Sequence, residues 1–311
     1  MEKISCALYV FLVLGMMAQS QEITQFQRSD FDLVGDVKSC EVITDYGKEI
    51  FEFDTLGRLI SLVTQYNEKD RDVTTYSFVD DHLLEKRFES YKDDELDHSS
   101  SIGHFYSIDS TDNKIIREQI VSYDREFVEF QEYHFDENEI LEKIIISHEN
   151  AVDEVIIERS YDQGEKLATY FNNGVIEKSV RLANRTGALG DSTTLEITKL
   201  YLDGEPSSAT ERSIDDNGLL MSEKRFEYDN QEQEFVAVAI HSFEYDDSGI
   251  PLKETIIKGK STSEKQFVFQ FDDNKEKNWV KKIVTPDNTF ITRRISYFEL
   301  EEENEVKSEG R

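Results

Sequence analysis

The feature that most constrains the fold of this chain is the run FEFDTLGRL at residues 51–59, where two alternating aromatic residues lead into an Asp and a Gly-closed turn. Phe51 and Phe53 lie two residues apart, so both rings are expected on the same face of a strand. Asp54 favours the first position of a turn, and Gly57 can adopt the positive φ that closes it. The run therefore predicts the joint of a β-hairpin, with Gly57 as its most sensitive residue.

Looser copies of this joint recur along the chain. From one copy to the next the Asp advances by 26 to 31 residues, with one double step of 53. A step of this length accommodates two strands and two turns, so each unit is predicted to be one hairpin. The aromatic residues before the Asp, including Tyr76, Tyr106 and Tyr133, are expected to stack into a cross-strand ladder of rings. The Asp positions are Asp54, Asp80, Asp109, Asp136, Asp162, Asp215, Asp246 and Asp272.

The repeats predict an all-β fold, namely a large antiparallel meander of repeated β-hairpins that forms a curled sheet or an open barrel. Asn173-Gly174 and Asp203-Gly204 lie between apolar runs and predict further two-residue hairpin turns. The residues to which we assign a structural role in turns are Asp54, Gly57, Asp215, Gly218, Asp246 and Gly249.

Residues 51–59 resemble the YD repeat (Rhs-type) consensus Y-x-Y-D-x-x-G-R-L, and residues 243–249 are nearly as similar. Residues 214–220 keep only the turn half, and residues 271–279 resemble a variant that ends in Gly-Asn-Trp. The resemblance extends over about residues 21–298. It implies an exported or surface bacterial protein whose antiparallel sheets curl into shells, with carbohydrate as a ligand. The repeats here are too few for a shell that encloses a toxin.

The N-terminus predicts export. Lys3 precedes an apolar run over residues 7–18, and Ala18 and Ser20 place small residues where a signal peptidase reads. We therefore expect residues 1–20 to be a signal peptide cleaved after Ser20, which places the protein outside the cell or in the periplasm. A retained N-terminal anchor is the alternative.

The rest of the chain is predicted to be one domain with a tail. Residues 21–298 form the repeat domain, and the acidic residues 299–311 form the tail. The Gly-bearing stretch 184–192 falls inside the double step, so the repeats would split into two halves there if the domain were divided.

The charge balance excludes some partners. With 35 basic and 66 acidic residues, the net charge of −31 repels nucleic acid and anionic lipid. We expect no nucleic-acid partner and no stable membrane insertion after signal cleavage. An outer-membrane barrel is a structural rival, but it needs uncharged lipid-facing positions, whereas residues 222–227 place charge on both faces of a strand.

The sequence shows no catalytic constellation, and we expect no cofactor and no metal site. The turns at Asp215 and Asp246 carry oxygen ligands but lack the EF-hand spacing, and the six His residues lack zinc spacing. Cys40, the single cysteine after residue 20, follows the pattern of a buried apolar residue. Trp279 is a candidate platform for a sugar ring, with a core role as the alternative.

Two hypotheses for function follow. The first is an exported β-repeat binding or scaffold module for a glycan or another component of the cell envelope. The alternative is a glycoside hydrolase-like enzyme that uses two carboxylates in the groove of the sheet. Acidic residues are too frequent here for the sequence to single out such a pair.

Overall fold

The structure, a computed structural model, describes residues 25–44, 47–186 and 192–299. This part of the chain consists of one short 3-10 helix, η1 (Arg28–Phe31), and twenty strands. The strands are β1 (Val37–Thr44), β2 (Gly47–Phe53), β3 (Leu59–Gln65), β4 (Arg71–Val79), β5 (His82–Lys92), β6 (Glu95–Asp109), β7 (Ile115–Ser122), β8 (Val128–Phe135), β9 (Leu141–Ser147), β10 (Val152–Asp162), β11 (Glu165–Asn172), β12 (Val175–Thr186), β13 (Ser192–Leu202), β14 (Glu205–Asp215), β15 (Leu220–Asp229), β16 (Glu234–Tyr245), β17 (Pro251–Lys258), β18 (Ser261–Phe271), β19 (Trp279–Thr285) and β20 (Thr289–Tyr297).

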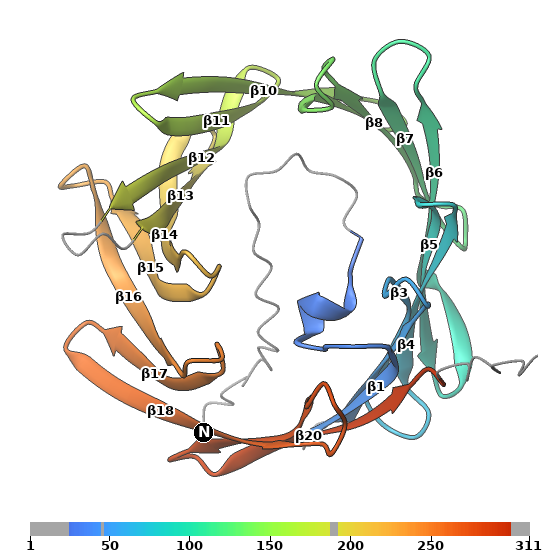
Figure 1. The fold of residues 1–311 in the computed structure, drawn as a ribbon. Coiled ribbons are helices and arrows are strands. Elements are labelled where there is room, and N and C mark those ends of the chain that lie inside the picture. The colour runs from blue at the N-terminus through green and yellow to red at the C-terminus, as the bar shows by residue number, and fades with distance from the viewer. Residues whose placement is uncertain (1–24, 45–46, 187–191, 300–311) are drawn as a thin grey trace, which may run out of the picture.

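The strands form one antiparallel sheet that closes on itself (Figure 1). Each strand pairs with its neighbours in sequence, and β20 pairs with β1, which places Arg293 opposite Val42 and Ile295 opposite Cys40. The predicted all-β antiparallel meander is confirmed, but the prediction of a curled sheet or open barrel is wrong. An even number of strands allows the first and last to meet antiparallel, and closure leaves no unpaired edge in the sheet.

The predicted joints all lie on one rim of the barrel, because each of the eight Asp residues ends or directly follows an even-numbered strand. At Asp54, the carbonyl accepts a hydrogen bond from the Gly57 N–H (3.0 Å), and Oδ1 accepts from the N–H groups of Leu56 (3.0 Å) and Arg58 (2.9 Å). Asp136, Asp215 and Asp246 repeat this set of bonds. One hairpin per repeat is thus confirmed.

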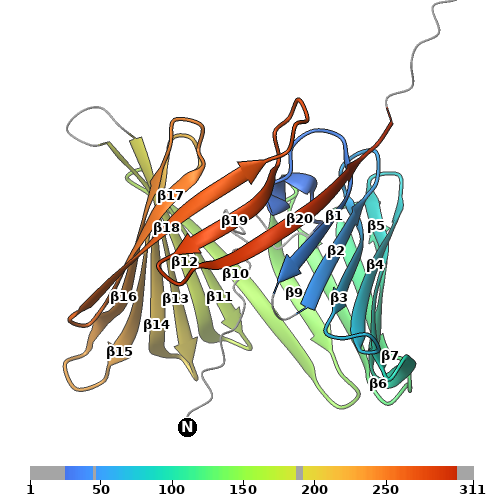
Figure 2. The same cartoon turned by 90° about the horizontal axis from the view of Figure 1, so that it is seen from below.

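Two-residue turns on the other rim also agree with the sequence. Asn173 and Gly174 have φ values of 49° and 82°, and Asp203 and Gly204 have 52° and 85°. Two successive positive φ values are typical of the type I′ turns that suit the twist of a hairpin. The long strands run between these two rims, as the side view shows (Figure 2).

The expected ladder of stacked rings does not form among the described residues. Within one hairpin unit the aromatic strand is followed by its return strand, so Lys86 lies opposite Tyr76 and Glu118 lies opposite Tyr106. Aromatic strands of successive units are therefore two strands apart, about 9.5 Å at the usual strand spacing, which is too far for direct ring stacking. Tyrosines alternate with other side chains around the inner wall instead.

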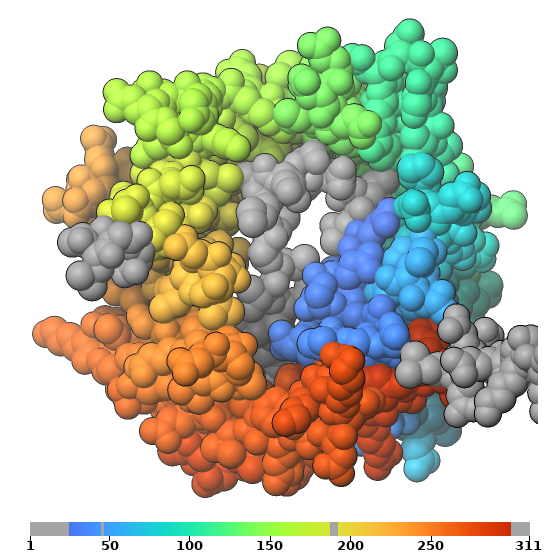
Figure 3. All heavy atoms as spheres, in the orientation of Figure 1, coloured from blue at the N-terminus to red at the C-terminus, as the bar shows by residue number. Residues whose placement is uncertain are grey.

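The main apolar core lies inside the barrel, against the segment 25–36. The ring of Phe31 lies 4.6 Å from that of Phe51 and 5.7 Å from that of Phe53, between ring centroids. The backbone of Val34 is held by Asn278, whose Oδ1 accepts from its N–H and whose Nδ2 donates to its carbonyl, both at 2.8 Å. This segment lies inside the barrel, against one side of its inner wall (Figures 1 and 3).

The outer face of the barrel carries charged side chains that pair across strands. Nε of Arg117 lies 2.8 Å from Oε1 of Glu132, and Nζ of Lys224 lies 2.8 Å from Oε1 of Glu211. Each such charge would cost about 2–4 kcal/mol if it faced the midplane of a lipid bilayer. Further pairs of this kind are Lys48–Glu41, Lys143–Glu154, Arg181–Glu165 and Lys253–Glu244.

Among the described residues, no helix is long and apolar enough to cross a membrane. Residues 1–20, the predicted signal peptide, lie outside the described part of the chain, as do residues 300–311 of the predicted tail and residues 187–191 of the predicted break. β12 and β13, which flank that break, pair from Lys178 with Leu200 to Thr186 with Ser192.

Candidate functional site

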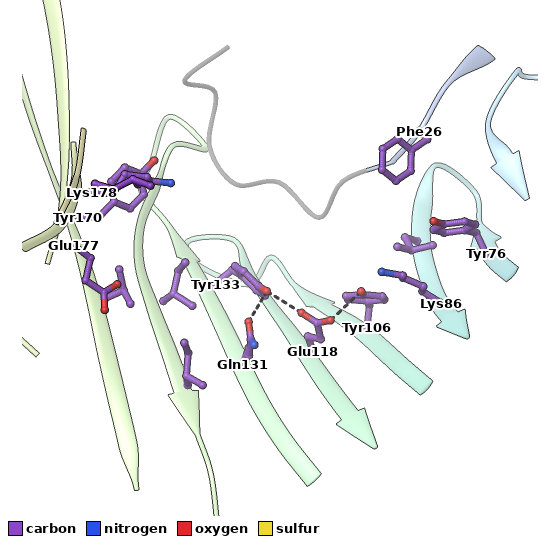
Figure 4. Close-up of a pocket in the computed structure, with 15 residues that line it drawn as sticks. Phe26, Tyr76, Lys86, Tyr106, Glu118, Gln131, Tyr133, Tyr170, Glu177 and Lys178 are labelled. Atoms are coloured by element: carbon purple, nitrogen blue, oxygen red, sulfur yellow. Dashed lines mark hydrogen bonds between the residues drawn. The ribbon is translucent and has the colours of Figure 1, made fainter. Parts of the chain in front are cut away.

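The inner wall of β4 to β13 surrounds a cavity of about 670 Å³ (Figure 4). Tyr76 and Lys86 lie at one end of it, and Tyr170 and Lys178 lie at the other. The remaining lining includes Phe26 from the inner segment and several aliphatic side chains of the strands. A concave surface with a few convergent polar groups on a rigid sheet is typical of a ligand site.

Four tyrosines line this cavity: Tyr76, Tyr106, Tyr133 and Tyr170. Burial raises the pKa of Tyr76 to about 12 and also raises the pKa of Tyr170. Burial, together with the nearby carboxylate of Glu118, raises the pKa of Tyr106 and Tyr133 as well. All four hydroxyls therefore stay protonated near neutral pH and can donate hydrogen bonds.

Glu118 lies at the centre of a hydrogen-bond network between two of these tyrosines. Oε1 lies 2.7 Å from Nδ1 of His104 and accepts from the Tyr106 hydroxyl at 2.9 Å, and Oε2 accepts from the Tyr133 hydroxyl at 2.8 Å. Burial is the largest effect and raises the pKa of Glu118, but the hydrogen bonds together outweigh it and hold the pKa below its ordinary value. The carboxylate is thus ionised and already well coordinated.

Each end of the cavity carries the same arrangement, a tyrosine with a lysine directly opposite it on the next strand. Tyr76 on β4 faces Lys86 on β5, and Tyr170 on β11 faces Lys178 on β12. The Lys178 ammonium lies 4.0 Å from the centroid of the Tyr170 ring, a cation–π contact. Burial lowers the pKa of Lys178.

The opposite wall of the lumen has charges that neutralise one another. Glu223 contacts Nε of Arg212 at 3.0 Å and a guanidinium nitrogen of Arg225 at 2.8 Å. Glu254, which is only 2% exposed, lies 2.8 Å from Nδ1 of His241. These side chains point into the lumen, but they form ion pairs and hydrogen bonds with one another and are therefore not available to a ligand.

Trp279, the sequence candidate for sugar stacking, does not line the large cavity. It lies against a second, small cavity of about 70 Å³ beside the inner segment. The guanidinium carbon of Arg293 lies 3.4 Å from the centroid of one of its rings, and the Phe269 ring approaches it edge-on at 5.8 Å. The stacking face that a sugar would need is thus already occupied by Arg293.

The other residues singled out in the sequence lie apart from the cavity. Asp54, Asp215 and Asp246 direct their carboxylates into their own turns on the rim. Cys40 is 1% exposed, and burial raises the pKa of its thiol to about 11. Gly57, Gly218 and Gly249 close the turns with φ values of 88°, 82° and 84°. In the described part of the chain, no group of three His, Cys, Asp or Glu residues could hold a metal ion.

The sequence contained one signal for the cavity that the repeat pattern obscured. Three of its tyrosines, Tyr76, Tyr106 and Tyr133, are in the aromatic alternations that were expected to form a ring ladder. A hydroxylated ring at a position that Phe fills in the first repeat indicates a polar neighbour. The lysines and Glu118 carried no comparable signal, because charged residues are common throughout the chain.

Comparison of the sequence with protein-family models found no match, and comparison with curated proteins found none either. Among solved structures, the chain is similar to a porin-like protein from Bacteroides uniformis, with 9% identity, a TM-score of 0.32, and coverage of 84% of this chain and 98% of that one. A porin-like protein from Bacteroides vulgatus gives 11% identity, a TM-score of 0.26, and coverage of 85% and 99%.

Proposed function

We propose that this chain is an exported binding module whose ligand site is the tyrosine-lined cavity in its lumen, and that the ligand is a glycan or another polyhydroxylated component of the cell envelope. The observation that carries the proposal is the convergence of Tyr76, Tyr106, Tyr133 and Tyr170 on one cavity of about 670 Å³. The resemblance of the joints to YD repeats supports an exported, carbohydrate-binding role.

The chemistry of the wall suits a sugar. Tyrosine offers an apolar ring for the C–H face of a pyranose and a hydroxyl for its hydroxyl groups, with few rotatable bonds to immobilise. Gln131, next to Tyr133, adds an amide to the same surface. Since these side chains stand on hydrogen-bonded strands, little ordering is required when a ligand enters.

Binding fits this wall better than hydrolysis does. A glycosidase needs one carboxylic acid with a raised pKa to protonate the leaving oxygen. Glu118, one of the two carboxylates that line the cavity, has a lowered pKa and accepts hydrogen bonds from both Tyr106 and Tyr133. The other, Glu177, accepts a hydrogen bond from Nδ2 of Asn172 at 2.8 Å.

The outer face supports a position in water within or outside the envelope. Its ion pairs, such as Arg117 with Glu132, need no partner other than solvent and one another. The polar groups suited to binding a ligand are then those that face the lumen.

A glycan array probed with the purified protein tests the proposal. We expect retention of a subset of glycans without release of shorter products, and loss of that retention in Tyr133→Ala and Tyr170→Ala. Tyr91→Ala is the matched control, because Tyr91 lies on the outer face and bonds Glu89 there. Release of cleaved sugar would refute the binding module, and equal retention by all three variants would place the site elsewhere.

A further inference from the structure

The two ends of the lumen cavity show the same arrangement, in which a lysine lies opposite a tyrosine on the neighbouring strand. Lys86 stands opposite Tyr76, and Lys178 stands opposite Tyr170. Both lysines line the cavity, and they come from strands that are seven apart in the sheet order. Figure 4 shows the two pairs facing the space between them, with Glu118 on the wall in the middle.

In the described part of the chain, neither ammonium has a carboxylate oxygen within 4.0 Å. Both lie on a concave wall of the lumen, in a protein with 66 acidic residues and a net charge of −31. On the opposite wall of the same lumen, Arg212 and Lys265 both approach carboxylates, at 3.0 Å from Glu223 and 3.8 Å from Glu254 respectively. Arg212 and Lys265 are thus neutralised by the protein, whereas Lys86 and Lys178 are left available to a ligand.

The carboxylates of the cavity do not compensate for the two lysines. Glu118 is coordinated by His104, Tyr106 and Tyr133, and Glu177 is held by Asn172. Because Lys178 is partly buried, burial disfavours its charged form. The electrostatic attraction between an anion and this ammonium would therefore be stronger than at an exposed lysine.

We propose that the ligand of this cavity is an acidic glycan, a polyhydroxylated chain with at least two anionic groups, one bound at Lys86 and the other at Lys178. The inference rests on the proposed function and specifies its ligand class. The hydroxyls of Tyr76 and Tyr170 donate to the sugar units beside each anionic group, and the stretch from Tyr106 to Tyr133 contacts the uncharged part between them. Carboxylate and sulfate groups share the chemistry that these ammonium groups recognise.

Two pairs of probes that differ only in charge test the proposal by titration calorimetry. The first pair is an oligogalacturonide and its methyl ester, and the second is dextran sulfate and dextran of matched length. We expect one charged probe to bind at least about tenfold more tightly than its neutral partner, with affinity falling as salt is added. The pair that shows this preference identifies carboxylate or sulfate as the anion.

The variants Lys86→Met and Lys178→Met keep the aliphatic stem and remove the charge. Each is expected to weaken the charged probe about tenfold, and the double variant should bind both members of the pair alike. Lys281→Met is the matched control, because Lys281 also lies over a ring, that of Phe290 at 4.8 Å, but on the outer face. Thermal unfolding of each variant checks that the barrel remains intact.

Three results would overturn the acidic ligand: equal binding of charged and neutral probes, a charge preference that survives in the double variant, or no binding of any of the four probes. Equal binding that is lost in Tyr170→Ala would leave the lumen as a site for neutral glycans, so the proposed function would stand. Absence of binding to these probes and to the whole glycan array would refute both the acidic ligand and the proposed function.

Discussion

Oε1 of Glu118 lies 2.7 Å from Nδ1 of His104, on the inner wall of the barrel. The same contact recurs between Glu254 and His241 at 2.8 Å. In each case the histidine lies two residues before the aromatic residue that faces the glutamate, Tyr106 in the first case. In these two repeats the buried glutamate thus takes the same position relative to the hairpin joint.

Replacing Glu118 with Gln should change how stability depends on pH. The native pKa of Glu118 is held below the ordinary value of 4.5, so below about pH 4.5 the native state binds fewer protons than the unfolded state. Its stabilising effect is present above that pH and is lost as the pH falls through the native pKa. Urea unfolding at a series of pH values should show Glu118→Gln less stable by about 1–3 kcal/mol at neutral pH, with a flatter decline in acid.

The matched control for this experiment is Glu137→Gln, since Glu137 is exposed on the rim. It should reproduce the wild-type curve at every pH. Parallel curves for wild type and Glu118→Gln in the acid range would show that the carboxylate does not titrate as the network requires.

Gly57→Ala should destabilise the barrel more than Gly218→Ala does. Both glycines have left-handed φ values, 88° and 82°, so each substitution carries a backbone penalty of about 1–2 kcal/mol. At Gly57 a Cβ would also lie 2.6 Å from Nε of Arg28, whereas at Gly218 it meets nothing within 4 Å. In urea denaturation, the free energy of unfolding of Gly57→Ala should be roughly 1 kcal/mol lower than that of Gly218→Ala. Equal losses would mean that Arg28 moves aside without cost.

Asn278→Ala should loosen the inner segment 25–36. The Asn278 side chain forms hydrogen bonds with both the N–H and the carbonyl of Val34. Its removal takes these two hydrogen bonds away, which should lower the stability of the segment by about 1–3 kcal/mol. Hydrogen exchange should accelerate around Val34, while the strands far from the segment keep their protection. Asn150→Ala, an exposed asparagine in the turn between β9 and β10, should leave exchange unchanged. An unchanged exchange rate at Val34 in Asn278→Ala would show that the aromatic packing alone holds the segment.

The closure of the barrel can be tested with a pair of cysteines. Ser39 on β1 and Ser296 on β20 lie directly opposite each other, with their hydroxyl oxygens 2.6 Å apart. In a background without the native cysteines, Ser39→Cys and Ser296→Cys should form an intramolecular disulfide on mild oxidation, detected by peptide mass spectrometry. A pair at Ser39 and Ser261, on strands that do not pair, should stay reduced in the monomer. A reduced Ser39–Ser296 pair under these conditions would contradict the β1–β20 seam.

The sequence by itself determined the local geometry. Asp54 and Gly57 specify a turn because their preferences for a side-chain hydrogen bond and a positive φ act within five residues, and the return of that pattern every 26 to 31 residues specifies a hairpin repeat. For the same reason the two-residue turn at Asn173 and Gly174 could be predicted.

Only the tertiary structure decided that the sheet closes and which side chains meet inside it. The pairing of Cys40 with Ile295 spans almost the whole chain, and it depends on the twist and register summed over every strand between them. Tyr76 and Tyr170 come to one cavity for the same reason, since their separation in space follows from the curvature of the barrel. Local preferences determine each joint. Curvature and closure depend on the geometry of all the joints together, so they cannot be predicted from any single repeat.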